Sequence, residues 1–209
     1  MSVEKKGWAS ANWPAYYRWT TKRPPRELLV RFLQQLEWEG KTGKGRKAIE
    51  LGCGSGTDSL ELLRRGWRVL ATDQQPEALD FLSKRVPPRS RGSITLLSSP
   101  MEELPLPRAH LVYASFSLPF CPPKDFARVW ENIRASLLPG GHFVGQLFGN
   151  RDEWVGERPL NFQTLRRVRA LARGYKLDLL RETEEEGHSF SGPKHWHFFD
   201  LILEKPWRL

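Results

Sequence analysis

The chain has 209 residues, 39% of them hydrophobic and 27% charged, which is a composition typical of a folded globular protein. No apolar stretch approaches the roughly 20 residues that a membrane-spanning helix needs. Residues 1–6 also lack the apolar run of a signal peptide, so a cytoplasmic location is expected. A formal net charge of +9 favours anionic partners such as RNA or acidic metabolites. The basic residues are scattered along the chain, so the charge raises the RNA hypothesis only modestly, and RNA stays open as a partner.

Strands and helices are expected to alternate along most of the chain. The stretch up to Thr21 is expected to be irregular or loosely helical, and a helix over 26–36 follows Pro24-Pro25. The remaining elements are expected as strands over 48–51, 67–72, 93–97, 110–115 and 142–148, helices over 58–65, 76–85, 124–138 and 161–171, and two closing strands over 176–183 and 197–203. Repeated β-α units predict a parallel sheet with right-handed crossovers.

The chain contains two cysteines, Cys53 and Cys121. Two cysteines are too few for a disulfide framework, and neither lies in a cluster with metal-ligand spacing. We therefore expect two free thiols and no metal site.

A glycine-rich segment follows the first expected strand. Residues 49–58 read Ile-Glu-Leu-Gly-Cys-Gly-Ser-Gly-Thr-Asp, with a glycine at every second position from 52 to 56. Alternating glycines let the backbone turn sharply from strand to helix and approach a ligand closely. The segment therefore predicts a ligand-binding turn.

Three ligand classes compete for this turn. A P-loop would need a Gly-Lys-Ser/Thr sequence at the helix start, and no lysine follows Gly56. A dinucleotide would seat its pyrophosphate on the helix N-terminus, where the Glu50 and Asp58 carboxylates would repel it. The two carboxylates instead suit a ligand that carries an amino group and a sulfonium. Asp73 is placed to hold the ribose hydroxyls of either adenosine ligand, or else to cap the turn before Pro76.

The segment 50–56 and Asp73 together resemble the first two motifs of the class I S-adenosylmethionine-dependent methyltransferases. The similarity continues through residues 101–107, the turn over 137–143 and the closing strand pair. Residues 12–17 and the short sheet are most similar to the tellurite-resistance-type, small-molecule branch of that family.

The resemblance implies a Rossmann-like α/β fold with helices on both faces of a mostly parallel, seven-stranded sheet of order 3-2-1-4-5-7-6. One methyltransferase domain would span residues 1–209, with a lid and a helix over 1–40 and the α/β core over 46–209. The resemblance also implies S-adenosyl-L-methionine as the cofactor and S-adenosyl-L-homocysteine as the product.

The cofactor-binding residues are expected along the ends of the first four strands. In the family pattern the glycine turn shapes the methionine side, Asp73 binds the ribose, and residues 100–102 border the adenine. The expected set is Tyr17, Arg23, Glu50, Gly52, Cys53, Gly54, Gly56, Asp58, Asp73, Gln74, Pro100, Met101, Glu102, Ala114, Ser115 and Phe116. Pro100 departs from the family, which often has an aspartate there to accept from the adenine amino group. Glu102 or a backbone carbonyl is expected to make that contact instead.

The N-terminal segment is expected to form a lid over the cofactor, with Tyr16, Tyr17 and Trp19 covering it. Arg18 or Arg23 would pair with the cofactor carboxylate through a charge-assisted hydrogen bond. Arg23 is favoured because the two prolines after it stiffen its placement.

The acceptor is expected beyond the carboxyl ends of the strands, below the final hairpin over 186–197. Aromatic side chains there would hold an apolar or flat acceptor, and the expected pocket consists of Phe120, Trp154, Phe190 and Trp196. The same aromatics also fit ordinary core positions, Trp196 above all. If the acceptor must lose a proton, His195 and His188 are the expected general bases, although each also fits a structural role.

The expected function is methyl transfer to a small molecule, by in-line displacement at an already activated donor. Two alternatives stay open: an RNA methyltransferase, which the positive charge favours, and a non-catalytic S-adenosylmethionine-binding regulatory protein. Residues 114–120 differ from the Asn/Asp-Pro-Pro-Tyr/Phe motif of enzymes that methylate base amines. No membrane partner is expected, and the protein is expected to be a monomer or a homodimer.

Overall fold

A computed structural model describes residues 12–157 and 159–207 of the chain. Its strands are β1 (Lys47–Leu51), β2 (Arg68–Asp73), β3 (Ile94–Ser98), β4 (Ala109–Ala114), β5 (Leu137–Gly149), β6 (Phe162–Gln163), β7 (Lys176–Ser189) and β8 (Gly192–Glu204). Its α-helices are α1 (Trp13–Thr20), α2 (Glu27–Trp38), α3 (Thr57–Arg64), α4 (Pro76–Arg85), α5 (Phe126–Ser136) and α6 (Leu165–Leu171), with 3₁₀ turns η2 (Pro88–Ser93) and η3 (Leu118–Phe120).

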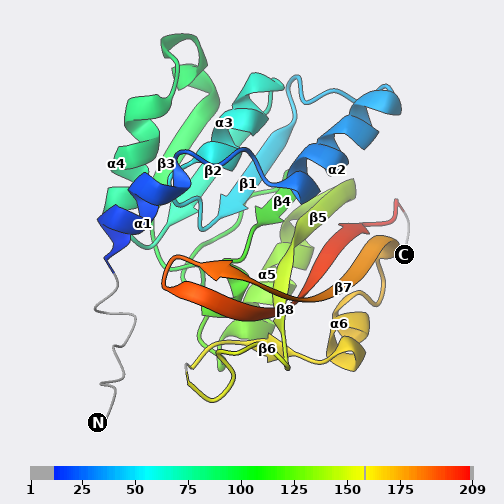
Figure 1. Cartoon of the computed structure of the whole chain (residues 1–209). Coiled ribbons are helices and arrows are strands. Elements are labelled where there is room, and N and C mark those ends of the chain that lie inside the picture. The colour runs from blue at the N-terminus through cyan, green and yellow to red at the C-terminus, as the bar shows by residue number, and fades with distance from the viewer. Residues whose placement is uncertain (1–11, 158, 208–209) are drawn as a thin grey trace.

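These strands form one sheet of order β3-β2-β1-β4-β5-β8-β7, as Figure 1 shows. The first five strands pair in parallel, and β8 runs antiparallel between β5 and β7. The predicted Rossmann-like order is therefore confirmed. One strand was not expected: the short β6 pairs in parallel with the end of β5, off the main path.

Helices cover both faces of the sheet, because the strands alternate apolar side chains between two buried clusters. On one face Ile49 and Leu51 of β1 pack with α5 and α6. On the other face Ala48 packs with α2, α3 and α4. A shift of β1 by one residue would move each of its side chains to the opposite face of the sheet and against the other helix layer. The two buried clusters therefore fix the register of this central strand.

Element boundaries match the expected ones closely in the first half of the chain and less well in the second. The helix expected over 161–171 begins only at Leu165, where the Thr164 side chain caps it by accepting from the backbone N–H of Arg167 at 3.3 Å. The two residues before that cap extend the sheet as β6. The helix expected over 124–138 ends at Ser136, because Leu137 already pairs with Ala109 of β4.

The closing strands are longer than the expected 176–183 and 197–203. Strands β7 and β8 pair from Lys176↔Glu204 to Ser189↔Gly192, so most of the hairpin expected over 186–197 is regular sheet. In Figure 1 the orange hairpin extends across the end of the sheet toward α1. No helix of the described part of the chain is both long and apolar enough to cross a membrane.

Gly56 and Gly45 give a matched test of how tightly the first turn packs. Both have a left-handed φ, +80° and +77°, but a Cβ on Gly56 would lie 2.3 Å from Leu82 Cδ1 of α4, whereas a Cβ on Gly45 would meet nothing within 4 Å. Gly45→Ala should cost about 1–2 kcal/mol of unfolding free energy through its backbone alone. Gly56→Ala should cost roughly 1–3 kcal/mol more through overpacking. Urea unfolding measures both, and equal losses would contradict the packing described.

Candidate functional site

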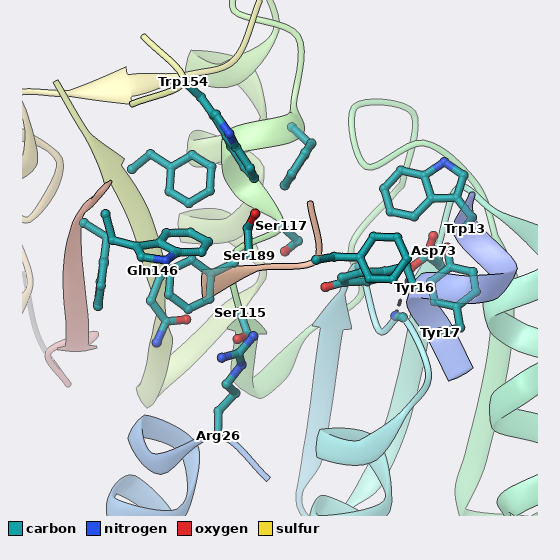
Figure 2. A pocket seen from close by; sticks show the side chains of 18 of the residues that line it. Trp13, Tyr16, Tyr17, Arg26, Asp73, Ser115, Ser117, Gln146, Trp154 and Ser189 are labelled. Carbon is teal, nitrogen blue, oxygen red and sulfur yellow. Dashed lines mark hydrogen bonds between the residues drawn. The ribbon is translucent and has the colours of Figure 1, made fainter. Parts of the chain in front are cut away.

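A cavity of about 710 Å³ lies at the carboxyl edge of the parallel strands, between α1, the ends of β1, β2 and β4, and the β7–β8 hairpin. This volume is within the range of roughly 300–1,000 Å³ that is usual for small-molecule sites. It is lined at one end by the glycine turn and Asp73 and at the other end by a group of aromatic side chains. Figure 2 shows both ends in one view.

The glycine turn is tied to β2 by two hydrogen bonds. The Cys53 N–H donates to the Thr72 carbonyl at 2.8 Å, and the Gly54 N–H donates to Asp73 Oδ2 at 2.9 Å. A Cβ on Gly52 would lie 2.5 Å from the Ser117 Cβ, so glycine is required there by close approach. Gly54 has φ +52°, and a Cβ placed on it would have only Tyr17 Cε1 nearby, at 3.9 Å. The backbone of Gly54 therefore faces open cavity and can lie against a ligand.

Asp73 serves its own turn as well as the cavity. Its Oδ2 accepts from Gly54 and its Oδ1 accepts from the Gln75 N–H at 3.0 Å. Burial raises the pKa of Asp73, and the backbone N–H donors oppose that rise. The turn-capping role considered from the sequence is therefore present. Each carboxylate oxygen retains acceptor capacity toward the cavity that Asp73 lines.

Asp58 does not face the large cavity, contrary to expectation. It is 1% exposed and accepts from Arg23 Nη1 at 3.1 Å and Nη2 at 2.8 Å, from the Arg26 N–H at 2.8 Å and from the Tyr113 hydroxyl at 3.1 Å. Four donors leave this carboxylate saturated, and Arg23 neutralises its charge. It borders only a small side cavity of about 40 Å³ behind the glycine turn.

Arg23 is likewise placed differently from the prediction. Its bidentate ion pair with Asp58 uses the guanidinium that was expected to meet the cofactor carboxylate. Arg26, in contrast, lines both cavities, and its buried Nε has no hydrogen-bond partner among the described residues. Figure 2 shows its side chain extending toward Ser115. The guanidinium carbon is 5.0 Å from the centre of the Phe116 ring.

Glu50 is buried in β1 beside the side cavity and accepts from the Ser59 hydroxyl. Burial raises the pKa of Glu50 to about 8, and the neighbouring Asp58 carboxylate adds to the rise. Glu50, like Asp58, borders the side cavity and does not line the large one, so neither predicted carboxylate lines the large cavity, and the charge of Glu50 depends on pH. Because Arg23 compensates the charge of Asp58, the expectation that Asp58 repels a pyrophosphate was wrong.

The adenine side of the cavity contains most of the residues expected there. Gln74, Met101 and Glu102 line it, together with Ser99. Pro100 does not line it, and the Pro100 carbonyl accepts from the Glu103 N–H at 3.1 Å within its own turn. Three further expected contacts also lie outside this cavity: Ala114 is buried in the core, Gly56 packs on α4, and Cys53 borders the side cavity.

The far end of the cavity is an aromatic box, which we define as Phe116, Phe120, Phe148, Trp154, Trp196 and Phe198. Its rings pack edge to face or tilted at 5.2–6.2 Å between centroids. Phe116, two residues after the end of β4, has φ +52°, a strained conformation for a residue with a side chain. Phe120, Trp154 and Trp196 lie where the sequence placed them, whereas Phe148 and Phe198 were missed.

A buried lysine supports this box from behind. The Lys194 ammonium lies 4.4 Å from the Trp154 ring centroid and 4.1 Å from that of Trp196, and it forms an ion pair with buried Asp152. Both partners of the pair are at most 1% exposed. The ammonium therefore fixes two walls of the box through cation–π contacts, a role that no sequence pattern indicated.

The N-terminal segment, expected as a lid, forms helix α1 beside the cavity. Tyr17 is 2% exposed and packs 5.8 Å from Phe81 of α4, while Tyr16 and Trp19 lie 5.7 and 5.8 Å from Phe190 at the hairpin tip. Phe190 thus lines the cavity as a lid contact and lies apart from the aromatic box. Residues 1–11 of the expected lid are outside the described residues.

The two expected general bases have different locations. His188 lines the cavity. His195 does not: its Nδ1 lies 2.7 Å from Glu186 and its Nε2 lies 3.2 Å from Glu184, on the outer side of the hairpin. These carboxylates raise the pKa of His195, which favours the protonated form that cannot act as a base. The structure therefore does not place His195 in the site.

Comparisons with known proteins agree with this geometry. Residues 48–141 match the family model described as a methyltransferase domain. A magnesium-protoporphyrin O-methyltransferase of Rhodobacter capsulatus is 34% identical over 89 residues, which are 43% of this chain and 40% of that protein. A carboxy-S-adenosyl-L-methionine synthase of Yersinia enterocolitica is 27% identical over 118 residues, or 54% of this chain and 44% of that protein. The matched region thus spans less than half of these relatives.

Solved structures show the same fold. TehB from Haemophilus influenzae superposes with a TM-score of 0.70 at 14% identity, over 85% of this chain and 61% of that one. The magnesium protoporphyrin IX methyltransferase ChlM from Synechocystis, solved with bound S-adenosylmethionine, gives 0.64 at 13% identity, over 85% and 77%.

The fold and the glycine turn define an α/β protein with a ligand-sized cavity at the carboxyl edge of its parallel strands. Residues 48–141 match a methyltransferase domain, and the fold is shared with a methyltransferase solved with bound S-adenosylmethionine. The resemblance to the tellurite-resistance-type branch is confirmed at the level of fold.

Glu50 predicts how stability changes with pH. The folded state keeps a proton on Glu50 up to about pH 8, whereas the unfolded chain releases it near 4.5. Between these values the native state binds more protons, so the free energy of unfolding should fall as pH rises, by up to about 1.4 kcal/mol per pH unit from this group. Glu50→Gln should flatten that slope. Exposed Glu103→Gln is the control and should retain it; urea titrations between pH 5 and 8 that give both variants the wild-type slope contradict the assignment.

Proposed function

We propose that the protein transfers a methyl group from S-adenosylmethionine to a small-molecule acceptor held in the aromatic box. The observation that carries the proposal is that one cavity joins the glycine turn and Asp73 to this box. When bound, the cofactor supplies a methyl group whose bond to sulfur breaks as the acceptor lone pair attacks in line, and the sulfur keeps the electron pair.

The protein's own residues then bind and orient the two molecules. Asp73 would accept from the ribose hydroxyls, and the backbone of Gly54 would lie along the methionine part. The Arg26 guanidinium would pair with the cofactor carboxylate, the role expected earlier of Arg23. Glu50, which borders the side cavity behind the glycine turn, would meet the amino group. Gln74, Met101 and Glu102 would border the adenine.

The lid and the box would keep water from the reacting atoms. The contact of Tyr16 and Trp19 with Phe190 closes the cavity between α1 and the hairpin. His188, which lines the cavity, is the general base if the acceptor must lose a proton. We further propose that residues 1–209 act as one methyltransferase unit, with α1 as its lid.

The experiment also distinguishes two alternative functions. The net charge of +9 supports an RNA methyltransferase, and a regulatory protein would bind the cofactor without turnover. S-Adenosylhomocysteine release is followed with a metabolite panel and, separately, with total cellular RNA. Turnover with a metabolite supports the proposal. Turnover with RNA alone, or binding without turnover on either panel, contradicts it.

Asp73→Asn tests the cofactor side. Loss of the charge should weaken S-adenosylhomocysteine binding by about 5- to 150-fold, equivalent to roughly 1–3 kcal/mol for hydrogen bonds to a charged group. Isothermal titration measures the change. The same substitution at exposed Asp80 on α4 is the control and should bind as wild type does. Equal affinities for the two variants would contradict the role of Asp73.

Arg26→Met separates the carboxylate contact from the rest of the cofactor. Affinity for S-adenosylhomocysteine should fall about 10- to 100-fold, as expected on losing a hydrogen-bonded charge pair. Affinity for 5′-methylthioadenosine, which has no carboxylate, should stay within about twofold. Arg31→Met, at an exposed position of α2, is the matched control. Similar losses for both ligands in the Arg26 variant would show that Arg26 acts elsewhere.

A further inference from the structure

Gln146 is a buried amide at the boundary between the cofactor end of the cavity and the aromatic box. It lies on β5, opposite Asp200 of β8, and is 3% exposed. Its neighbours along β5 are apolar, which makes it an isolated polar residue in a core strand. Both Gln146 and Asp200 line the cavity, and Figure 2 shows the amide on the side of Ser115.

The direction of the amide is set by Asp200. Gln146 Nε2 donates to Asp200 Oδ1 at 2.9 Å, while Asp200 Oδ2 accepts from Arg181 Nε at 2.8 Å and lies 2.7 Å from Arg181 Nη2. An ionised carboxylate only accepts hydrogen bonds, so the NH₂ group of the amide must face Asp200. Gln146 Oε1 then points away from Asp200, and it has no hydrogen-bond partner among the described residues.

This oxygen defines what a ligand in the box must offer. A carbonyl oxygen accepts only, and leaving it buried without a donor is unfavourable. The surrounding rings of Phe116, Phe148 and Trp196 favour a flat apolar body.

Cations already lie on these rings. Arg26 is over Phe116, and Lys194 is over Trp154 and Trp196. Faces of Phe116, Trp154 and Trp196 are thus already used by the protein's own cations, which favours a neutral donor group over a cationic acceptor.

We propose that Gln146 is the specificity-determining residue of the acceptor site and that the acceptor class is a neutral, flat aromatic compound with a hydroxyl or ring N–H group. That group donates to Gln146 Oε1 and orients the ring in the box. The amide is a positioning group: it removes no proton, and the bound group need not be the atom that is methylated. The inference rests on the proposed function, because it assigns the acceptor of the same cavity.

Indole and benzofuran test the proposal, since they share a bicyclic shape and differ in the N–H donor. With S-adenosylhomocysteine saturating the protein, wild type should bind indole at least fivefold more tightly than benzofuran. Gln146→Leu should bring that ratio close to one, while S-adenosylhomocysteine affinity stays within about twofold. Isothermal titration or ligand-observed NMR gives the dissociation constants, and urea unfolding checks that each variant is folded.

Gln163→Leu is the matched control. Gln163 is also 3% exposed with an unpaired Oε1, but it lies on β6 and does not line the cavity. It should keep the wild-type ratio. A wild-type ratio near one, or no binding of either probe, overturns the proposal whatever the variants do. If Gln146→Leu loses affinity for S-adenosylhomocysteine but keeps the preference for indole, Gln146 Oε1 contacts the cofactor, and the proposal is also overturned. If wild type fails to bind S-adenosylhomocysteine at all, the proposed function itself fails.

Discussion

The buried carboxylate of Asp58 connects the N-terminal segment to the nucleotide-binding core. It binds the guanidinium of Arg23, the backbone of Arg26 and the hydroxyl of Tyr113, and so joins the segment before α2, the start of α3 and the end of β4. Removing one partner of such a buried ion pair usually costs several kcal/mol, because the remaining charge is left uncompensated. This junction fixes the backbone from which Arg26 reaches the cavity, and the lid and the carboxylate site depend on it.

The cavity separates charge from apolar surface along its length. Its cofactor end offers Asp73, Arg26 and the free faces of the glycine turn, while its other end is made of rings. Of the two cations on those rings, Lys194 is paired with Asp152, and Arg26 also lines the side cavity behind the glycine turn. A polar cofactor and a neutral flat acceptor can therefore occupy neighbouring volumes without exchanging places, which is the arrangement that in-line transfer requires.

Local patterns predicted the sheet and the nucleoside end well, because glycine spacing, strand alternation and helix caps act within a few residues. The order of the strands, the turn at Gly54 and the cavity position of Asp73 were all readable. Contacts between distant segments were not. Nothing in the sequence tells that Arg23 pairs with Asp58, 35 residues away, or that glutamates on β7 surround His195. Gln146 did leave a signal, a lone amide within an apolar strand, and alternation along β5 would have found Phe148.

A crystal structure with bound S-adenosylhomocysteine tests the central claim most directly. The ribose hydroxyls should lie on Asp73, the carboxylate on Arg26 with the Arg23–Asp58 pair intact, and the sulfur should face the aromatic box. Electron density with the carboxylate on Arg23, with the sulfur turned away from the box, or with the nucleoside outside the glycine turn would contradict it.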